Sequence, residues 1–138
     1  MRLPKTIKIY GDTSFRDSQC RRESSEQKDA FGRLKENYPV LYELAVHPKN
    51  EGERTGWQST ADQQQGALNT GASDIIIPGN PSFVCELKRK DHTQSKITKD
   101  QITYLETAQS MGSFACIALG ADAVIAAIDD WLRIYYNK

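Results

Sequence analysis

Two apolar runs separated by a Pro-Gly-Asn-Pro stretch constrain the fold of this chain more than any other feature. They lie in the segment SDIIIPGNPSFVCELKRK, and the proline and glycine residues between them are typical of a turn. We therefore predict a β-hairpin. If its strands pair symmetrically about Asn80, Ile76 lies opposite Val84, and Asp74 lies opposite Glu86.

The predicted hairpin has one apolar face and one charged face, because successive side chains of a strand point to opposite sides. The apolar face carries Ile75, Ile77, Phe83, Cys85 and Leu87. The other face brings Asp74, Glu86 and Lys88 together. One interpretation is a half-exposed strand with a solvated ion pair. The interpretation we favour is a strand that is buried on one side and catalytic on the other.

The charged face predicts a particular chemistry. Asp74 and Glu86 on neighbouring strands could share a divalent cation, and ligation by oxygen alone suits Mg²⁺ or Mn²⁺ rather than zinc. Such a cation would polarise a phosphoryl oxygen and lower the pKa of a water molecule. Lys88, one pleat further along, could orient that water or help to deprotonate it. The pattern therefore indicates hydrolysis of a phosphate ester.

Hydrophobic periodicity and helix-breaking residues predict the other elements. In chain order they are a short strand or arm at 5–10, a helix at 23–39, a strand at 40–47, a polar loop at 48–56, a short helix at 57–71, an amphipathic helix at 98–112, an apolar strand at 113–120 and a last helix through Trp131 to Tyr135. We expect Ser24 or Ser25 to cap the first helix and Asp122 to cap the last. Pro39 should end the first helix, and Gly112 the helix at 98–112.

The hairpin and its charged residues resemble the signature of the PD-(D/E)XK nuclease superfamily. Asp74 is followed by eleven intervening residues and then by Glu86-Leu87-Lys88, as in that signature. The stretch GASDIII resembles the superfamily's Gly-x-Pro-Asp-hydrophobic segment, with Ser73 in place of the usual proline. That departure concerns the geometry of the turn more than the chemistry.

Two further segments resemble the VRR-NUC family within this superfamily. ITKDQITYLETAQSMGSFACI resembles its downstream block, in which a glutamine, here Gln101, opens a helix that leads into the next strand. HPKNEGERT resembles the polar loop of stand-alone, phage-type VRR-NUC proteins. The resemblance runs in the right order from about residue 23 to 133.

The resemblance implies a restriction-endonuclease-like α/β fold with a four-stranded mixed central sheet flanked by helices. We place this nuclease domain at 23–138, after a basic N-terminal arm at 1–22. The implied activity is that of a Mg²⁺-dependent DNA endonuclease, with Mn²⁺ as a substitute, acting as a homodimer on branched DNA such as Holliday junctions. The alternatives are a nuclease for flaps, nicks or single strands, a nuclease subunit of a larger complex, and a DNA-binding or interaction module that does not cleave.

The resemblance also assigns roles to residues of the predicted site. Asp74, Glu86 and the backbone carbonyl of Leu87 would be metal ligands, and Lys88 would be the catalytic lysine. The family's acid on the first helix is assigned to Glu26, although Glu23 could also take this role.

A second set of residues would act on the substrate. Gln101 could contact the scissile phosphate or fix Lys88. The residues that we expect to contact the DNA backbone are His47, Asn50 and Arg54 in the polar loop, and Arg89, Lys90, Lys96 and Lys99 beside the hairpin. We do not assign His47 as a general base, because a lone histidine at the end of a strand is more often structural.

The composition excludes several other classes of protein. The formal net charge is zero, although basic residues are concentrated near the N-terminus and in the middle of the chain. Three widely spaced cysteines argue against a disulfide framework and a zinc site. No stretch is long and apolar enough for a signal peptide or a membrane span. We expect a cytoplasmic protein, in the bacterial host if it is phage-encoded.

The last predicted helix carries more apolar residues than one core-facing stripe needs. We expect Trp131 or Ile134, with Tyr135 and Tyr136, to form the aromatic-rich interface of the homodimer. The alternative is that these residues pack within one copy of the chain.

Overall fold

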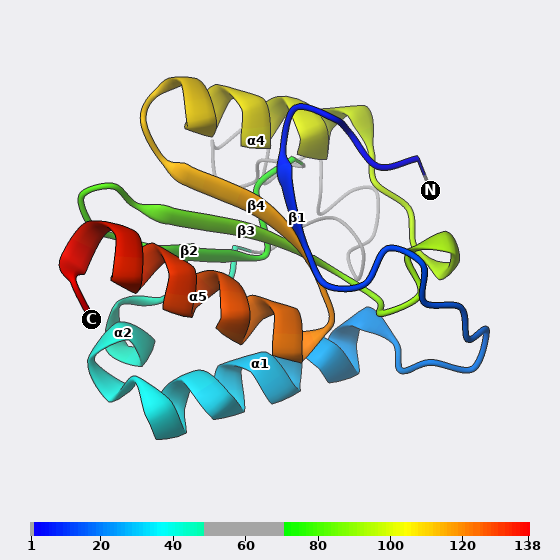
Figure 1. Ribbon diagram of the computed structural model, residues 1–138, viewed down its shortest axis with the longest axis horizontal. Helices are drawn as coiled ribbons and strands as arrows, with labels where there is room; N and C mark the ends of the chain where they lie inside the picture. The colour runs from blue at the N-terminus through cyan, green and yellow to red at the C-terminus, as the bar shows by residue number, and fades with distance from the viewer. Residues whose placement is uncertain (1, 49–70) are drawn as a thin grey trace, which may run out of the picture.

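The computed structural model describes residues 2–48 and 71–138, and it arranges them around one mixed β-sheet (Figure 1). The strands are β1 (Lys8–Tyr10), β2 (Ile75–Ile77), β3 (Phe83–Lys88) and β4 (Phe114–Leu119), in the spatial order β1-β4-β3-β2. β1 and β3 run parallel to β4, and β2 runs antiparallel to β3. The predicted four-stranded mixed α/β sheet is therefore confirmed.

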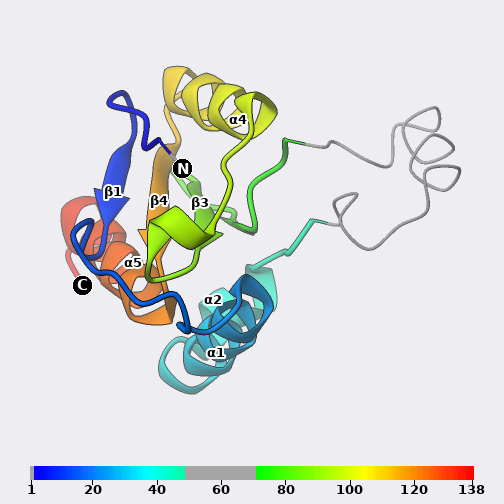
Figure 2. The same ribbon diagram turned by 90° about the vertical axis from the view of Figure 1, so that its right-hand side faces the viewer.

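Helices cover both faces of this sheet (Figures 1 and 2). They are α1 (Glu23–Asn37), α2 (Pro39–Leu44), α4 (Lys99–Ser110) and α5 (Ala121–Tyr136), with a short 3₁₀ helix, η2, at His92–Gln94. α1 and α5 pack on the face that carries Phe83, Cys85 and Leu87. α4 places Leu105 on the opposite face, against Val84 and the alternate side chains of β4. Within the described residues, no helix is long and apolar enough to cross a membrane.

The register of the hairpin is the predicted one. Ile76 pairs with Val84, and the flanking pairs are Ile75 with Cys85 and Ile77 with Phe83. All five apolar side chains of the predicted face are buried against α1 and α5. The solvated ion pair is wrong, however, since every residue of β3 is buried. α4 covers the second face, so that the charged side chains of this strand lie inside the protein.

The strand predicted at 40–47 is wrong. Residues Pro39–Leu44 form α2, with the proline at the start of the helix, where its missing N–H costs nothing. Only Val46 makes a β-bridge, to Ile76. An apolar run of this length fits either a strand or a helix, and periodicity alone does not separate the two. Pro39 therefore begins a helix, and α1 already ends at Asn37.

Both predicted N-caps are also wrong. α1 begins after Arg22 and α5 after Gly120, and neither residue caps its helix with a side chain. Asp122 lies in the first turn of α5, where its carboxylate pairs with Arg33 and Lys90 instead. By contrast, the helix predicted at 98–112 and the strand at 113–120 are present as α4 and β4.

Two other predictions concern the domain boundary after residue 22 and the region from 48 to 71. β1 lies within the basic arm at 1–22 and pairs with β4, so the sheet takes residues from both sides of the boundary predicted after residue 22. The loop predicted at 48–56 and the helix at 57–71 lie almost wholly outside the described residues. Asn50 and Arg54 lie outside them as well.

Trp131 is part of the core of one chain and not of its surface. Its side chain is 1 % exposed and stacks obliquely on Phe83, with ring centroids 5.4 Å apart. Its indole N–H donates to the backbone carbonyl of Pro81 at 2.9 Å. The interface prediction is therefore wrong for Trp131, whereas Ile134, Tyr135 and Tyr136 remain exposed.

Candidate active site

Asp74 and Glu86 meet where β2 begins beside β3. The register that pairs Ile75 with Cys85 puts the residue before β2 alongside Glu86. Asp74 Oδ2 accepts a hydrogen bond from the backbone N–H of Leu87 at 2.8 Å, so the carboxylate is fixed to the neighbouring strand. Only 9 % of Asp74 and 1 % of Glu86 are exposed. Two acidic groups therefore share a nearly dry space.

Glu86 is not stabilised as an anion by the groups around it. Burial raises its pKa well above the ordinary value of a glutamate, and the adjacent Asp74 carboxylate raises it further. Lys88 opposes this shift without cancelling it. Glu86 Oε1 is buried and has no hydrogen-bond partner among residues 2–48 and 71–138. A buried carboxylate oxygen without a donor, beside a second carboxylate, has the chemistry of a cation ligand.

Lys88 is held by the segment that leads into α4. Its Nζ donates to the backbone carbonyl of Lys96, and to Gln101 Oε1 at 3.2 Å. It lies 3.6 Å from Glu86 Oε2. Gln101 Oε1 also accepts from the backbone N–H of Thr98 at 3.0 Å, as part of a capping box at the start of α4. Of the two contacts considered for Gln101, the one to Lys88 is present.

The same arrangement of helices and strands occurs in a solved structure. A protein described as a "VRR_NUC domain protein" superposes with a TM-score of 0.68 and 21 % sequence identity, over 84 % of this chain and 92 % of that chain. The fold is a VRR-NUC fold. No protein-family model matches the sequence, and neither does any curated protein. The resemblance seen in the sequence is thus confirmed for the fold.

In this VRR-NUC fold, Glu23 lies closer to the charged group than Glu26 does. Glu23 Oε1 is 3.8 Å from Lys88 Nζ, and burial raises the pKa of Glu23 while Lys88 lowers it. Glu26 instead forms an ion pair with Arg21 and accepts from the backbone N–H of Ala121 at 3.1 Å. Glu23 is therefore the acid beside Lys88, and the assignment of the helix-borne metal ligand, to Glu26 with Glu23 as the alternative, stays a prediction.

The side chain of His47 contacts the main chain of Asp74. Its Nδ1 lies 2.8 Å from the backbone carbonyl oxygen of Asp74, and its ring packs edge-on against Phe31 of α1. Together with the bridge between Val46 and Ile76, this contact fixes the chain where β2 begins. His47 therefore helps to hold Asp74 in place.

The basic residues near the site differ in their contacts. Arg89 donates to the backbone carbonyls of Cys20 and Arg21, and thereby ties the N-terminal region to the end of β3. Lys90 lies 3.7 Å from Asp122. The side chains of Lys96 and Lys99 are exposed. Only these last two are free to meet a ligand without first breaking a contact among the described residues.

Sequence reasoning missed Ser95, which connects several of these groups. Its Oγ accepts from the backbone N–H of Arg89 at 3.0 Å, and its side chain also hydrogen-bonds Glu23. Ser95 is buried, although it lies in a short polar stretch. No pattern distinguishes it from the exposed polar residues around it, so only the tertiary fold reveals it.

The donors at this site fit a hard cation that keeps part of its water shell. Among the described residues, no three His, Cys, Asp or Glu side chains are grouped so as to hold a metal ion by themselves. The N–H and C=O of a residue in a strand point to the same side, so the carbonyl of Leu87 points to the side on which its N–H meets Asp74. Two carboxylates, one carbonyl and water make an all-oxygen set of the kind Mg²⁺ prefers.

Proposed function

We propose that this protein is a metal-dependent DNA endonuclease that hydrolyses phosphodiester bonds. The observation that carries the proposal is the buried pair of Asp74 and Glu86 beside a lysine held in place by two acceptors. Within the described residues, Glu86 Oε1 has no hydrogen-bond partner, and Glu86 Oε2 lies 3.6 Å from Lys88 Nζ. A protein gains no stability from burying two carboxylates side by side. Such an arrangement is expected where a cation and a charged substrate complete it.

Asp74, Glu86 and the carbonyl of Leu87 would hold the metal ion, and we propose Mg²⁺ with Mn²⁺ as a substitute. A bound ion of this kind polarises a phosphoryl oxygen and lowers the pKa of a water molecule. We assign the helix-borne acid to Glu23, which is half-buried at the open side of the group. Glu23 would contribute a further oxygen, directly or through water.

Lys88 would act on the substrate and on water. An ammonium group has three N–H donors, and two of them point to Lys96 O and Gln101 Oε1. Glu86 Oε2 and Glu23 Oε1 lie 3.6 and 3.8 Å from Nζ, beyond ordinary hydrogen-bond distance. The third N–H would therefore serve a water molecule or a phosphate oxygen. Gln101 belongs to α4, and Lys96 to the segment that leads into it. Because both acceptors are held there, the ammonium group is oriented before the substrate arrives, which lowers the cost of reaching the transition state.

We propose branched DNA, including four-way junctions, as the preferred substrate. The resemblance to stand-alone VRR-NUC proteins supports this, and it is an argument from analogy. Lys96 and Lys99 flank Lys88 on the exposed side and would neutralise phosphates. Arg89 and Lys90 could contribute after exchanging their present partners. Contacts from His47, Asn50 and Arg54 stay predictions.

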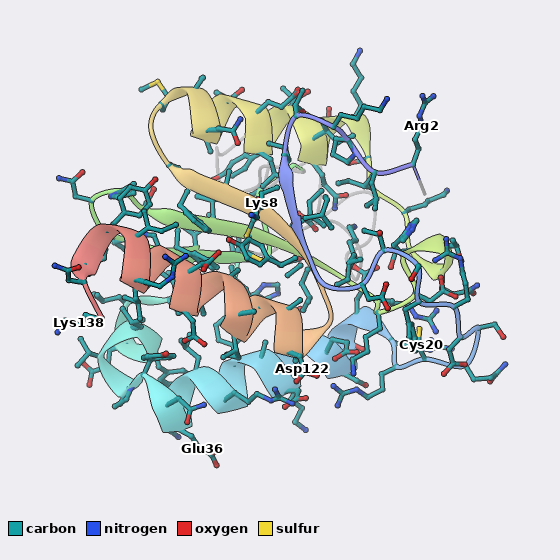
Figure 3. The ribbon with its side chains drawn as sticks, in the orientation of Figure 1. Arg2, Lys8, Cys20, Glu36, Asp122 and Lys138 are labelled. Atoms are coloured by element: carbon teal, nitrogen blue, oxygen red, sulfur yellow. The ribbon has the colours of Figure 1, made fainter. Side chains whose placement is uncertain are left out.

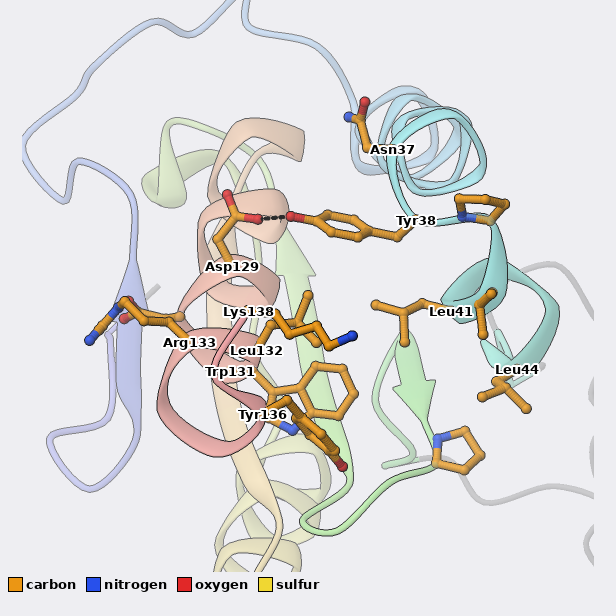
Figure 4. A pocket seen from close by; sticks show the side chains of 14 residues that line it. Asn37, Tyr38, Leu41, Leu44, Asp129, Trp131, Leu132, Arg133, Tyr136 and Lys138 are labelled. Carbon is orange, nitrogen blue, oxygen red and sulfur yellow. Dashed lines mark hydrogen bonds and ion pairs between the residues drawn. The ribbon is translucent and has the colours of Figure 1, made fainter.

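We also propose a homodimer, since cutting both strands at a junction takes two active sites. Ile134 and Tyr135 are each about half exposed, at 52 % and 50 %. Tyr136, which is 37 % exposed, lines an apolar groove of about 790 Å³ between α2 and the end of α5. Figure 4 shows Leu41 and Leu44 facing Trp131 and Tyr136 across this groove. A second copy could bury this surface, and light scattering after size exclusion would measure the mass.

One experiment separates the candidate functions. The pure protein is incubated with fluorescent four-way junction, flap, nicked duplex, linear duplex and single-stranded DNA, each with Mg²⁺, Mn²⁺ or EDTA. We expect cleavage with either metal, none with EDTA, and the highest rate on the junction. The variant Glu86→Gln, purified identically, controls for contaminating nucleases.

The other outcomes identify the alternatives. A higher rate on flaps, nicks or single strands would replace the junction as the substrate. Binding of DNA without cleavage under any metal condition would contradict the nuclease proposal, and would favour an interaction module.

A further inference from the structure

A groove runs between the N-terminal segment and the start of α4, outside the charged group described above. Its volume is about 660 Å³. Ile97 and Ile102 contribute apolar surface to it, and Arg2, Lys5 and Lys99 bring positive charge. Glu106 is the one acid among the described residues that line it. Neither the fold nor the proposed chemistry of Lys88 requires three cations here.

The positive charge of this groove exceeds its negative charge within the described part of the chain, where three cations face the single carboxylate of Glu106. There, Arg2, Lys5 and Lys99 form no ion pair, whereas Arg21 and Arg33 each bind an aspartate. Glu106 accepts a hydrogen bond from Thr6 Oγ1 at 2.7 Å and so serves to hold the N-terminal segment. The groove therefore presents a positive surface.

The N-terminal segment is fixed to α4. In addition to the hydrogen bond from Thr6 to Glu106, the side chain of Gln109 donates to the backbone carbonyl of Thr6 at 3.2 Å. The next residue, Ile7, is 4 % exposed and packs against the α4 face of the sheet. Lys5 is adjacent to this anchored stretch, so its charge is held near Lys99.

The groove adjoins the candidate active site through one short segment. Ile97 and Lys99 line the groove, while the carbonyl of Lys96 accepts from Lys88. In Figure 2 the N-terminus, the start of α4 and the end of β3 lie on the side that faces the viewer. A polymer with its reacting group at Lys88 can thus extend into the groove.

We propose that this groove binds the phosphate backbone of a double-stranded DNA arm on one side of the cleaved bond. This inference rests on the proposed nuclease function. Three cations match the repeated negative charge of phosphates, and the apolar floor can contact sugars. None of the described residues that line the groove is aromatic. They form no stacking platform of the kind on which single strands are bound, so the occupant that we propose is a duplex.

The test measures the salt dependence of DNA binding. Fluorescence anisotropy with a labelled blunt duplex in EDTA gives the affinity at several salt concentrations without cleavage. The groove variant combines Arg2→Gln, Lys5→Gln and Lys99→Gln. Each lost phosphate contact reduces the slope of log affinity against log salt by about 0.9, so we expect a slope smaller by about 2.7.

A matched control variant combines Lys35→Gln, Arg133→Gln and Lys138→Gln, which removes the same charge at the opposite end of the molecule. Figure 3 shows that Arg2 and Lys138 lie at opposite ends. We expect the control to keep the slope of the unaltered chain. A third variant, with Arg2→Lys, Lys5→Arg and Lys99→Arg, should also keep it. Light scattering checks that all variants have the same mass, and thermal unfolding checks that they fold.

The outcomes distinguish this inference from the nuclease proposal. Suppose that the unaltered chain cleaves DNA, but the slope of log affinity against log salt decreases equally in the groove variant and the control variant. The groove assignment is then overturned, and the nuclease proposal stands. An equal loss of slope on single-stranded DNA overturns the choice of a duplex. If the unaltered chain neither binds nor cleaves DNA, the nuclease proposal itself fails.

Discussion

Glu26 and Glu86 are both almost completely buried glutamates, but their surroundings have opposite signs. Glu26 lies against the positively charged Arg21 and the N-terminus of α5, which donates the N–H of Ala121. Glu86 lies beside another carboxylate, and a lysine 3.6 Å away only partly compensates for it. In the part of the chain that the structure describes, each has one carboxylate oxygen without a hydrogen-bond partner. Burial alone therefore does not distinguish these two acids, whereas burial beside like charge makes Glu86 the candidate cation ligand.

Of all the substitutions, Glu86→Gln should have the largest effect, which is on the rate of DNA cleavage. Loss of a metal ligand should lower the cleavage rate more than about 100-fold, because even residues behind the ligands cost 10- to 100-fold in metal sites. DNA binding should be equal or slightly tighter, since one negative charge near phosphate is removed. Cleavage and gel-shift assays on the same preparation measure both, and retained cleavage would contradict the site assignment.

Lys88→Ala should lower the maximal cleavage rate by about 100-fold and leave the Mg²⁺ requirement nearly unchanged. The amine acts on water and phosphate rather than on the ion, and positioned proton-transfer groups contribute on this scale. A titration of activity with Mg²⁺ separates the two quantities. A large rise in the Mg²⁺ requirement at an unchanged maximal rate would make Lys88 a structural residue.

Replacing each of the two glutamates by glutamine should change the free energy of unfolding of the protein in opposite directions. Glu26→Gln removes a charge-assisted bond to Arg21 and a negative charge at the N-terminus of α5, and should lower the free energy of unfolding by about 1–3 kcal/mol. Glu86→Gln removes a carboxyl group whose ionisation is disfavoured in the folded state, and should raise the stability of the metal-free protein. Urea unfolding in EDTA at neutral pH measures both. Destabilisation of similar size in both variants would erase the distinction between the two acids.

The stabilisation by Glu86→Gln should also depend on pH. The ordinary pKa of a glutamate is 4.5. Near this pH, Glu86 keeps its proton in the folded state, where its pKa is raised, whereas Glu86 of the unfolded state loses its proton. The folded state then binds more protons, so the unaltered chain loses stability as pH rises toward the folded pKa. The advantage of Glu86→Gln should grow over the same range. Unfolding in EDTA from pH 4.5 to 8 tests this, and a constant difference would contradict it.

The hairpin was predictable because its register is dictated by local pattern. Five apolar residues fall on one face only if the strands pair about Asn80, and that register carries Asp74 to Glu86. Gln101 could be placed near Lys88 only through the family resemblance, because residues on different elements have no shared period.

What could not be predicted depends on tertiary contacts. Glu23 and Glu26 are three residues apart in one helical turn, and only the position of α5 decides which of them faces Lys88. The run from 40 to 47 has no period that excludes a strand. Trp131 is of a residue type that is common in interfaces, yet its indole N–H donates a hydrogen bond to the carbonyl of Pro81 inside the core.

The central claim, that Asp74 and Glu86 form a cation site, is tested most directly by calorimetric titration of the protein with Mn²⁺ in the absence of DNA. The unaltered chain should bind Mn²⁺ and release a proton, because the raised pKa of Glu86 leaves a proton to be displaced. Glu26→Gln should retain this binding, and Glu86→Gln should lose it. Equal Mn²⁺ binding by the unaltered chain and by Glu86→Gln, or no Mn²⁺ binding by the unaltered chain, would contradict the claim.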